Sequence, residues 1–324
     1  QIDRAVDAML AARKPVFYVG GGVILASASE QLRGLVRTLG APVASTLMGL
    51  GAFPGTDPLS LGMLGMHGTY EANMAMDGAD LVIALGARFD DRVTNNPDKF
   101  SPKATIIHMD IDAASINKII EANIALLGDG GWVIEQLSMR LIQAMKSQHK
   151  SARKEREEGL KNWWQQVDDW RAANGLNHDM EPQAEKPILP QLAIQSLYKV
   201  TGGDAFVCSD VGQHQMFAAQ YYHFDEPRRW INSGGLGTMG FGLPSAMGVQ
   251  MGNPGATVTC VTGEGSFMMN MQELSTCLQY GLPIKIINLN NQALGMVKQW
   301  QDMQYGGRHL SLIHISEPTR HSII

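Results

Sequence analysis

Apolar and polar positions follow two alternating periods along most of this chain. Short aliphatic, β-branched runs predict strands, and segments with apolar residues three or four apart predict helices. In residues 1–147 the expected strands are Pro15–Val19, Pro42–Ser45, Leu81–Leu85, Thr105–Asp110 and Ile124–Leu127. The expected helices are Ile2–Ala12, Ser27–Leu39, Tyr70–Met76 and Ala113–Ile120. Repeated strand–helix units predict a parallel sheet with helices on both faces.

The same alternation returns in residues 188–309. The expected strands there are 205–209, 229–232, 257–261 and 284–289, and the expected helices are 188–200, 214–222, 241–251 and 266–280. We therefore predict an α/β protein with two doubly wound parallel-sheet domains, residues 1–147 and 188–309. Residues 148–187 between them are rich in mixed charge and then in breakers, which indicates a solvated helix followed by a linker. A basic nucleic-acid-binding arm is disfavoured because acidic residues interleave with the basic ones.

Composition narrows the class of protein. The chain has 324 residues, 44% of them hydrophobic and 18% charged, with a net charge of -5. This is typical of a soluble globular protein and argues against a nucleic-acid surface. We find neither a signal peptide nor an apolar run long enough for a membrane span, so we expect a cytoplasmic protein. Cys208, Cys260 and Cys277 are widely spaced, and we expect buried, reduced side chains rather than a redox pair.

Candidate metal ligands follow two strands of the second domain. Glu264 stands in a glycine turn after the strand ending near residue 261, and Asn291 follows the strand ending near residue 289. Because the carboxyl ends of parallel strands meet at one edge, both side chains are expected in one crevice. Their oxygens suit Mg²⁺, with room left for phosphate oxygens.

The residues around Glu264 suit a diphosphate. Gly263 and Gly265 allow close approach to the backbone, and a helix opening at Ser266 points free amide groups toward an anion. Two ordinary loop turns without a ligand are the alternative on these residues alone.

The spacing of this motif resembles the thiamine-diphosphate signature of a superfamily of decarboxylases and synthases. Glycine, acid and glycine are followed by an Asn-Asn pair ending at Asn291, 27 residues after Glu264. That superfamily usually has Asp at the position of Glu264, so the carboxylate here is displaced by one methylene. A second string, Gly128-Asp129-Gly130, is excluded because Arg156 stands 27 residues after Asp129.

Several local strings resemble the large catalytic subunit of the acetohydroxyacid synthase (acetolactate synthase) family. They are residues 64–68 (LGMHG), 86–93 (GARFDDRV), 211–216 (VGQHQM), 233–240 (SGGLGTMG) and 295–300 (GMVKQW). The resemblance covers residues 1–309. It implies that the first domain is the FAD-binding central domain and that the second binds thiamine diphosphate.

For the first domain the resemblance implies a set of FAD contacts. They are Gly20, Gly21, Gly22, Thr46, Leu47, Met66, His67, Gly68, Arg88, Arg92, Asp110 and Asp129. Glycine amides and guanidinium groups suit a diphosphate, but they do not by themselves distinguish FAD from NAD or CoA. On residue type alone, residues 20–22 could also form a tight strand–helix turn without a ligand. His67 could also be a histidine that is hydrogen-bonded to backbone.

For the second domain the resemblance implies thiamine-diphosphate and Mg²⁺ contacts. The backbone of Gln213 and His214 would meet the diphosphate, and the Gly237 carbonyl would meet the aminopyrimidine. Met239 would support the bent cofactor, and the carbonyl of Ala293 would join Glu264 and Asn291 at the metal. On residue type alone, Met239 is also a core residue and His214 a backbone-bonded histidine.

The implied reaction is decarboxylation of pyruvate and ligation of the two-carbon unit to pyruvate or 2-ketobutyrate, in branched-chain amino-acid biosynthesis. Arg92 and Trp300 would hold the acceptor, with Met66, Val211 and Met296 shaping the pocket. FAD would be structural, because the reaction has no net redox change. Trp300 as core packing is the alternative on residue type. Another thiamine-dependent 2-ketoacid enzyme, of the glyoxylate carboligase or pyruvate oxidase type, and an inactive cofactor-binding remnant are the competing functions.

The resemblance also implies a homodimer or larger assembly and a small regulatory subunit. The resemblance places the family's catalytic Glu in an amino-terminal domain that we expect to be missing from this sequence, and it implies a thiamine domain that continues beyond Arg308. We therefore expect the isolated chain to be inactive. Residues 310–324 depart from the family and resemble a translated sequencing adaptor, so we expect a non-native tail.

Overall fold

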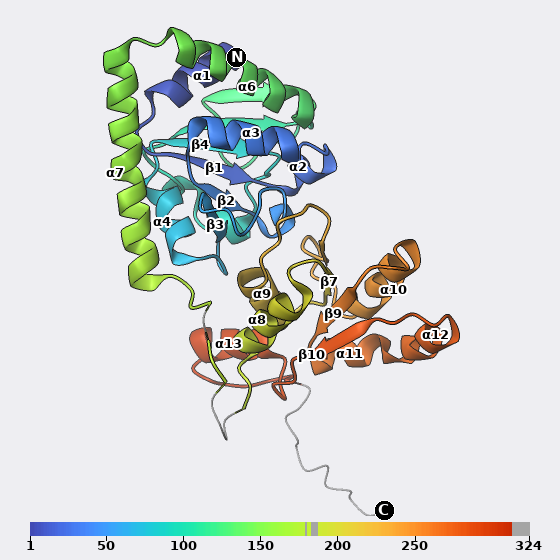
Figure 1. Cartoon of the computed structure of the whole chain (residues 1–324). Helices are drawn as coiled ribbons and strands as arrows, with labels where there is room; N and C mark the ends of the chain where they lie inside the picture. Colours follow the sequence, from blue (N-terminus) through green and yellow to red (C-terminus); the bar gives the residue numbers. More distant parts are fainter. Residues whose placement is uncertain (179, 183–186, 313–324) are drawn as a thin grey trace, which may run out of the picture. The chain divides into compact units, whose positions relative to one another are not determined.

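The computed structural model describes residues 1–178, 180–182 and 187–312 (Figure 1). The chain forms two compact units, each described here by itself. Unit 1 comprises Gln1–Asp179 and His223–Arg228, and unit 2 comprises Met180–Tyr222 and Arg229–Ile324. The tail expected at 310–324 lies outside the described residues from residue 313 onward.

Unit 1 is built on a six-stranded parallel sheet with the order β3-β2-β1-β4-β5-β6, counted over the described residues. The strands are β1 (Pro15–Val19), β2 (Val43–Ser45), β3 (Ser60–Met63), β4 (Leu81–Leu85), β5 (Thr105–Asp110) and β6 (Ile124–Leu127). The order reverses between β1 and β4, which is where ligands bind in open α/β sheets. The predicted fold class is confirmed for this unit.

Two hydrophobic cores cover the two faces of the unit 1 sheet, because successive strand side chains point to opposite faces. Phe17 and Val19 face the core formed with α1 (Ile2–Ala11), α3 (Ser29–Leu39) and α6 (Gly130–Ser147). Val16 and Tyr18 face the core formed with α4 (Tyr70–Gly78) and α7 (Lys150–Asn174) (Figure 1). All five residues of β1 are buried, as expected for a central parallel strand.

Helix α7 corrects one expectation. The charged segment was expected to be solvated, but Trp163 and Val167 are fully buried on unit 1, and Trp163 Nε1 donates a hydrogen bond to the Pro15 carbonyl at 3.0 Å. The apolar positions recur one helical turn apart among many charges. One face of α7 is therefore part of the core.

A short excursion of the chain, residues 223–228, also belongs to unit 1. Asp225 accepts hydrogen bonds from the backbone N–H and the hydroxyl of Thr56, both at 2.9 Å. Arg33 donates to the Asp225 carbonyl at 2.7 Å, and Gly55 donates to the Phe224 carbonyl at 3.0 Å. No hydrophobic period in the sequence marks this excursion.

Unit 2 contains a parallel sheet of four strands in the described part, with the order β10-β9-β7-β8. The strands are β7 (Phe206–Ser209), β8 (Trp230–Asn232), β9 (Val258–Thr262) and β10 (Lys285–Asn288). The helices are α8 (Pro190–Thr201), α9 (Gln213–Tyr221), α10 (Gly242–Gly252), α11 (Glu264–Asn270), α12 (Leu274–Gln279) and α13 (Gly295–Gln304). The strand order reverses between β7 and β9, and this unit also has the predicted fold class.

Three predicted helices differ from the structure. The helix expected at Ala113–Ile120 is a run of turns, in which Asp110 and Asp112 side chains accept the backbone N–H groups of Asp112 and Ala114. Such local hydrogen bonds compete with helix formation. The helix expected from Ser27 begins at Ser29 after a short α2 (Gly21–Leu25), and that expected at 266–280 is divided by a 3-10 turn, Met271–Glu273. Strand β3, the short α5 (Asp91–Thr94) and the helices α6 and α13 were not predicted.

The cysteines agree with the prediction. Cys208, Cys260 and Cys277 are free and buried, in β7, β9 and α12. Burial raises the pKa of Cys208 to about 12, so this thiol stays protonated near neutral pH. Among the described helices, none combines the length and apolar character needed to cross a bilayer.

Candidate cofactor-binding site

The reversal of strand order in unit 2 brings three turns together. Asp210–Gly212 follows β7, Gly263 follows β9, and Asn290–Gln292 follows β10. Ser266, in the first turn of α11, donates its hydroxyl to the Val211 carbonyl at 3.0 Å. The carboxyl ends of the three strands therefore form one continuous edge at the predicted site.

The two predicted metal ligands converge at this edge. Glu264 Oε1 and Asn291 Oδ1 accept the same backbone N–H, that of Ala293, at 2.9 and 3.2 Å. The oxygens of Glu264 and Asn291, which follow neighbouring strands, thus lie close together at Ala293. The Ala293 carbonyl, the third predicted ligand, belongs to this same residue. No group of three or more His, Cys, Asp or Glu side chains could hold a metal ion within the described residues. Because Glu264 and Asn291 supply two side-chain oxygens, a cation at this edge would keep coordination positions for phosphate oxygens.

Gln213 connects this pair to the helices around it. It is the first residue of α9, and its Oε1 accepts a hydrogen bond from Asn291 Nδ2 at 3.0 Å. Its Nε2 donates to Gln299 Oε1 in α13 at 3.4 Å. The side chain of Gln213 therefore holds the Asn291 amide with its Oδ1 on the Ala293 N–H that Glu264 also contacts.

Three glycines at this edge let neighbouring side chains pack directly against the backbone of the turns. A Cβ at Gly263 would lie 2.8 Å from His214 Nδ1, and one at Gly295 would lie 2.1 Å from Gln213 Oε1. At Gly265 a Cβ would lie 2.6 Å from a methyl group of Leu294. We call this set of turns and glycines the unit 2 cradle, and a side chain at any of the three positions would fill it.

His214 is a buried histidine at the cradle. Its side chain is 7% exposed, and its Nε2 is buried with no hydrogen-bond partner in the part of the chain that the structure describes. Burial lowers its pKa to about 4, and a hydrogen bond with the Asp210 backbone opposes that shift, so the ring is neutral near pH 7. Buried polar atoms are normally paired. The ring packs against two glycines of the cradle, 2.6 Å from a Cβ placed at Gly212 and 2.8 Å from one placed at Gly263, and a polar group there is compatible with a diphosphate.

Asp210 was missed in the sequence and is the most connected side chain near the cradle. Its carboxylate is 1% exposed and accepts the backbone N–H groups of Val211 and Gly240 at 2.8 Å and of Gly242 at 3.1 Å. The only signal for it in the sequence was an acid directly after a buried strand. It holds the loop that carries Gly237 and Met239, and the Met239 methyl group lies 3.8 Å from a Cβ placed at Gly265.

The predicted pocket residues of unit 2 lie around the same edge. Val211 is in the turn after β7, and Met296 and Trp300 are in α13. Trp300 is 46% exposed, so it is not a core residue of unit 2. Arg92 and Met66, their predicted partners, belong to unit 1, and the joint pocket stays a prediction.

In unit 1 the predicted FAD contacts all follow the carboxyl ends of strands. Residues 20–22 follow β1, residues 46–47 follow β2, residues 66–68 follow β3, Arg88 and Arg92 follow β4, Asp110 ends β5, and Asp129 follows β6. Large apolar side chains are exposed at the same ends. They are Leu25, Met48, Met66, Ile111 and Leu127, between 47% and 84% exposed. Exposed apolar side chains gathered at a sheet's ligand edge fit the rings of a large cofactor.

Two of the predicted contact loops of unit 1 are joined through backbone. Met66 N–H donates to the Arg92 carbonyl at 2.8 Å, which places His67 beside Arg92. Burial, and then the Arg92 charge, lower the pKa of His67, so a neutral imidazole stands next to the guanidinium group. Arg92 is exposed and presents its charge at the sheet edge.

Other predicted FAD contacts have partners within the protein. Arg88 forms an ion pair with Asp90, and Asp129 Oδ1 caps α6 by accepting the Trp132 N–H at 3.0 Å. Asp110 accepts the Asp112 N–H at 2.9 Å. These bonds explain the residues locally and leave their cofactor role a prediction.

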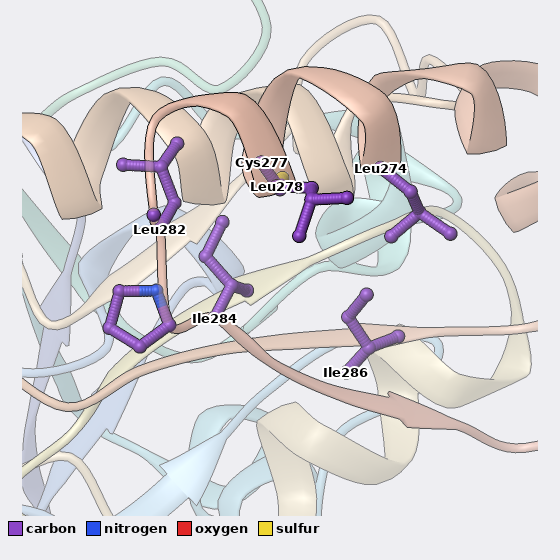
Figure 2. A pocket seen from close by; sticks show the side chains of 8 residues that line it. Leu274, Cys277, Leu278, Leu282, Ile284 and Ile286 are labelled. Carbon is purple, nitrogen blue, oxygen red and sulfur yellow. The ribbon is translucent and has the colours of Figure 1, made fainter.

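A separate apolar cavity of about 310 Å³ lies between α12 and β10 in unit 2 (Figure 2). Its labelled side chains are Leu274, Cys277, Leu278, Leu282, Ile284 and Ile286. It has no charged or strongly polar side chain that could bind a phosphate.

Comparisons with known proteins agree with these two units. Residues 2–137 match the central domain of thiamine pyrophosphate enzymes, and residues 210–320 match their C-terminal TPP-binding domain. The chain therefore belongs to the thiamine pyrophosphate enzyme family, thiamine pyrophosphate being another name for thiamine diphosphate.

Within this family the chain is similar to acetolactate synthase large subunits. It is 57% identical over 309 residues to the isozyme 3 large subunit of Escherichia coli, which covers 95% of this chain and 52% of that subunit. It is 52% identical over 310 residues to the large subunit of Haemophilus influenzae, with the same coverage. It is 46% identical over 309 residues to that of Corynebacterium glutamicum, covering 95% of this chain and 48% of that subunit. The chain thus spans about half the length of these relatives.

Proposed function

We propose that this chain is the cofactor-binding part of an acetolactate synthase large subunit. The parent enzyme would decarboxylate pyruvate and ligate the two-carbon unit to a second 2-ketoacid, in branched-chain amino-acid biosynthesis. The observation that carries the proposal is the convergence of Glu264 and Asn291 on one backbone N–H at the ends of two adjacent strands. Similarity to acetolactate synthase large subunits over 95% of the chain supports it.

In unit 2 the cradle residues would hold the diphosphate end of thiamine diphosphate. Glu264, Asn291 and the Ala293 carbonyl would bind Mg²⁺, and Gln213 and His214 would meet the phosphate oxygens. When bound, thiamine diphosphate supplies an electron sink for loss of carbon dioxide. The protein's own contribution is to fix the cation between two strand ends.

In unit 1 the sheet edge would hold FAD. The exposed apolar side chains there would cover its rings, and the glycine turn and Arg88 would lie near its diphosphate. Arg92 and Trp300 would hold the acceptor, because a guanidinium fork matches a carboxylate and an indole gives an apolar wall for a methyl or ethyl group. The acceptors would be pyruvate and 2-ketobutyrate.

We further propose the assembly and location that the relatives suggest. Their name as large subunits implies a small regulatory subunit, and the resemblance implies a homodimer or larger assembly in the cytoplasm. The division of cofactor contacts between two units fits an enzyme whose reaction centre needs more than one folded part.

A chimera tests the proposed activity. Residues 1–309 of this chain would replace the matched 309 residues of the E. coli isozyme 3 large subunit, and acetolactate formation from pyruvate would be measured with thiamine diphosphate, Mg²⁺ and FAD. We expect acetolactate from the chimera and none from the isolated chain. Addition of 2-ketobutyrate should give acetohydroxybutyrate as a second product.

The chimera also separates the competing functions. Products of glyoxylate carboligation or of pyruvate oxidation, in place of acetolactate, would support another 2-ketoacid enzyme. A folded chimera that binds the cofactors and forms no product would support a non-catalytic remnant. A Trp300→Leu chimera should lose acceptor preference while it still binds thiamine diphosphate.

A further inference from the structure

We propose that Asp210 is a positioning residue. It fixes the distance between the Gly237–Met239 loop and the unit 2 cradle, and this distance gives the site its affinity for the thiamine rings. Asp210 contacts no predicted cofactor ligand through its side chain. It acts through the loop, because it binds backbone N–H groups of Gly240 and Gly242, which follow the loop. The inference rests on the proposed function, because the loop is the part of the site predicted to meet the rings.

The carboxylate of Asp210 accepts three backbone N–H groups, one from the next residue, Val211, and two from residues that directly follow the loop. Oδ1 accepts from Val211 and Gly240, both at 2.8 Å, and Oδ2 accepts from Gly242 at 3.1 Å. The carboxylate thus joins the end of β7 to the point where the loop enters α10. A carboxylate that accepts three backbone N–H bonds in a buried place is a strong and directional tie.

The glycines beyond the loop are explained by this tie. A Cβ at Gly242 would lie 2.9 Å from Asp210 Cβ and 3.0 Å from its Oδ2. Gly240 has a φ of +86°, and a Cβ there would lie 2.7 Å from Asn270 Nδ2. Asn270 Nδ2 donates in turn to the Gly240 carbonyl at 2.6 Å. Asp210 and Asn270 therefore hold Gly240 through its N–H and its carbonyl.

The consequence for the site concerns Met239 and Gly237, which precede this double tie. Gly237 and Thr238 are exposed, and Met239 is partly buried with its methyl group near Gly265. Nothing else described in the loop is bonded to the sheet edge by a buried charge. Asp210 therefore holds the loop at a fixed distance from the cradle through Gly240 and Gly242, whereas the side chains predicted to meet the metal and the diphosphate are held by the separate bonds among Gln213, Asn291, Glu264 and Ala293.

The loop and the diphosphate contacts can be tested separately. A general loss of stability would weaken binding of both ligands, whereas displacement of the loop would weaken binding of only one. Affinities of the chain and of Asp210→Asn for thiamine diphosphate and for inorganic diphosphate would be measured by calorimetry with Mg²⁺. The Asn amide keeps the Oδ1 bonds but places a donor against the Gly242 N–H. Affinity for thiamine diphosphate should fall by about tenfold or more, and affinity for inorganic diphosphate should change by less than about threefold.

Two further variants make the result decisive. Asp204→Asn is the matched control in the same unit, because its carboxylate is 79% exposed and pairs with Arg229 at the surface, and both affinities should be unchanged. Asn270→Ala removes the other tie to Gly240 and should give the same split with a smaller loss. If Asp210→Asn does not fold, Asn270→Ala decides the question.

Several outcomes would overturn the inference. These are an equal loss of both affinities in a folded Asp210→Asn chain, unchanged affinities in that variant, or no split in Asn270→Ala when it alone folds. If the unsubstituted chain binds thiamine diphosphate no more tightly than inorganic diphosphate, the loop adds nothing to the rings and the inference also fails. Failure of the unsubstituted chain to bind either ligand overturns the proposed function and the inference together.

Discussion

The first glycine turn of unit 1 and the glycine turns of unit 2 look alike in sequence, but their neighbours differ. In unit 1 a Cβ at Gly20 would lie 2.1 Å from the Gly86 carbonyl oxygen, and one at Gly22 would lie 2.7 Å from Gly86 Cα. In unit 2 a Cβ at Gly295 would meet the side chain of Gln213, and one at Gly263 would meet that of His214. Backbone surrounds Gly20 and Gly22, whereas side chains surround the unit 2 glycines, polar ones at Gly263 and Gly295 and apolar ones at Gly265.

This difference separates two uses of glycine at the carboxyl edge of a parallel sheet. Gly20 and Gly22 let the turn after β1 pack on the turn after β4, which closes the sheet where its strand order reverses. Gly263 and Gly295 let polar side chains that can bind a ligand pack against the turns of unit 2. Packing explains the first set without a cofactor, whereas the second set is explained only together with its polar neighbours.

The largest expected effect comes from filling the packing contact. Gly20→Ala should destabilise unit 1 by about 3 kcal/mol or more, because the new methyl group meets backbone that cannot move aside. Urea unfolding would measure the loss, and hydrogen exchange in β1 and β4 would locate it. Gly34→Ala in α3 is the control, since no atom lies within 4 Å of its Cβ position. It should stabilise by up to about 1 kcal/mol, and equal effects of the two changes would contradict the packing account.

A second effect should appear as a pH dependence of stability. The pKa of His214 is lowered to about 4 in the folded chain, below its ordinary value of 6.5, because the ring is buried. Between those values the unfolded chain binds a proton that the folded chain does not, so the free energy of unfolding falls as the pH falls. The loss should reach about 2 kcal/mol at pH 5.

His214→Gln tests this assignment by difference. The variant should lose less stability than the unsubstituted chain between pH 7 and pH 5, while the contributions of other histidines remain in both. Denaturant unfolding at each pH gives the two slopes. Parallel slopes would mean that the ring titrates normally and that the unit 2 cradle does not bury it.

A smaller effect is expected from filling the unit 2 cradle. Gly295→Ala places a methyl group against Gln213 and Asn291, which are side chains that can turn away. The free energy of unfolding should change by less than about 1 kcal/mol, while affinity for thiamine diphosphate with Mg²⁺ should fall by about tenfold. Gly248→Ala in α10 is the control, because its Cβ position has no atom within 4 Å. A large loss of stability without a loss of affinity would make Gly295 a packing glycine like Gly20.

Much of the fold could be predicted from local pattern. Pro15–Val19, Leu81–Leu85, Thr105–Asp110 and Ile124–Leu127 are strands at the predicted bounds, because buried parallel strands read as uninterrupted apolar runs. The turns at 111–120 were predicted as a helix because their apolar spacing is helical, and the aspartate side chains that bond the backbone there were overlooked. The buried face of α7 was hidden by the charges around it. The excursion at 223–228 depends on contacts with Thr56 and Arg33, far away in sequence.

Part of the candidate site could also be predicted from local pattern, because the pattern locates the strands. Glu264 and Asn291 follow adjacent strands, so topology alone brings them to one edge. Asp210 was not recognised, because its role depends on N–H groups 30 and 32 residues away in sequence. The unpaired Nε2 of His214 is likewise a property of burial, which no short motif contains.

The most direct test of the central claim is calorimetric titration of thiamine diphosphate into this chain with Mg²⁺ and with the cation removed by chelation. We expect binding that requires Mg²⁺ and that weakens by at least about tenfold in Glu264→Gln and in Asn291→Ala. Affinity that is the same with and without Mg²⁺, or that is unchanged in both variants, would contradict it.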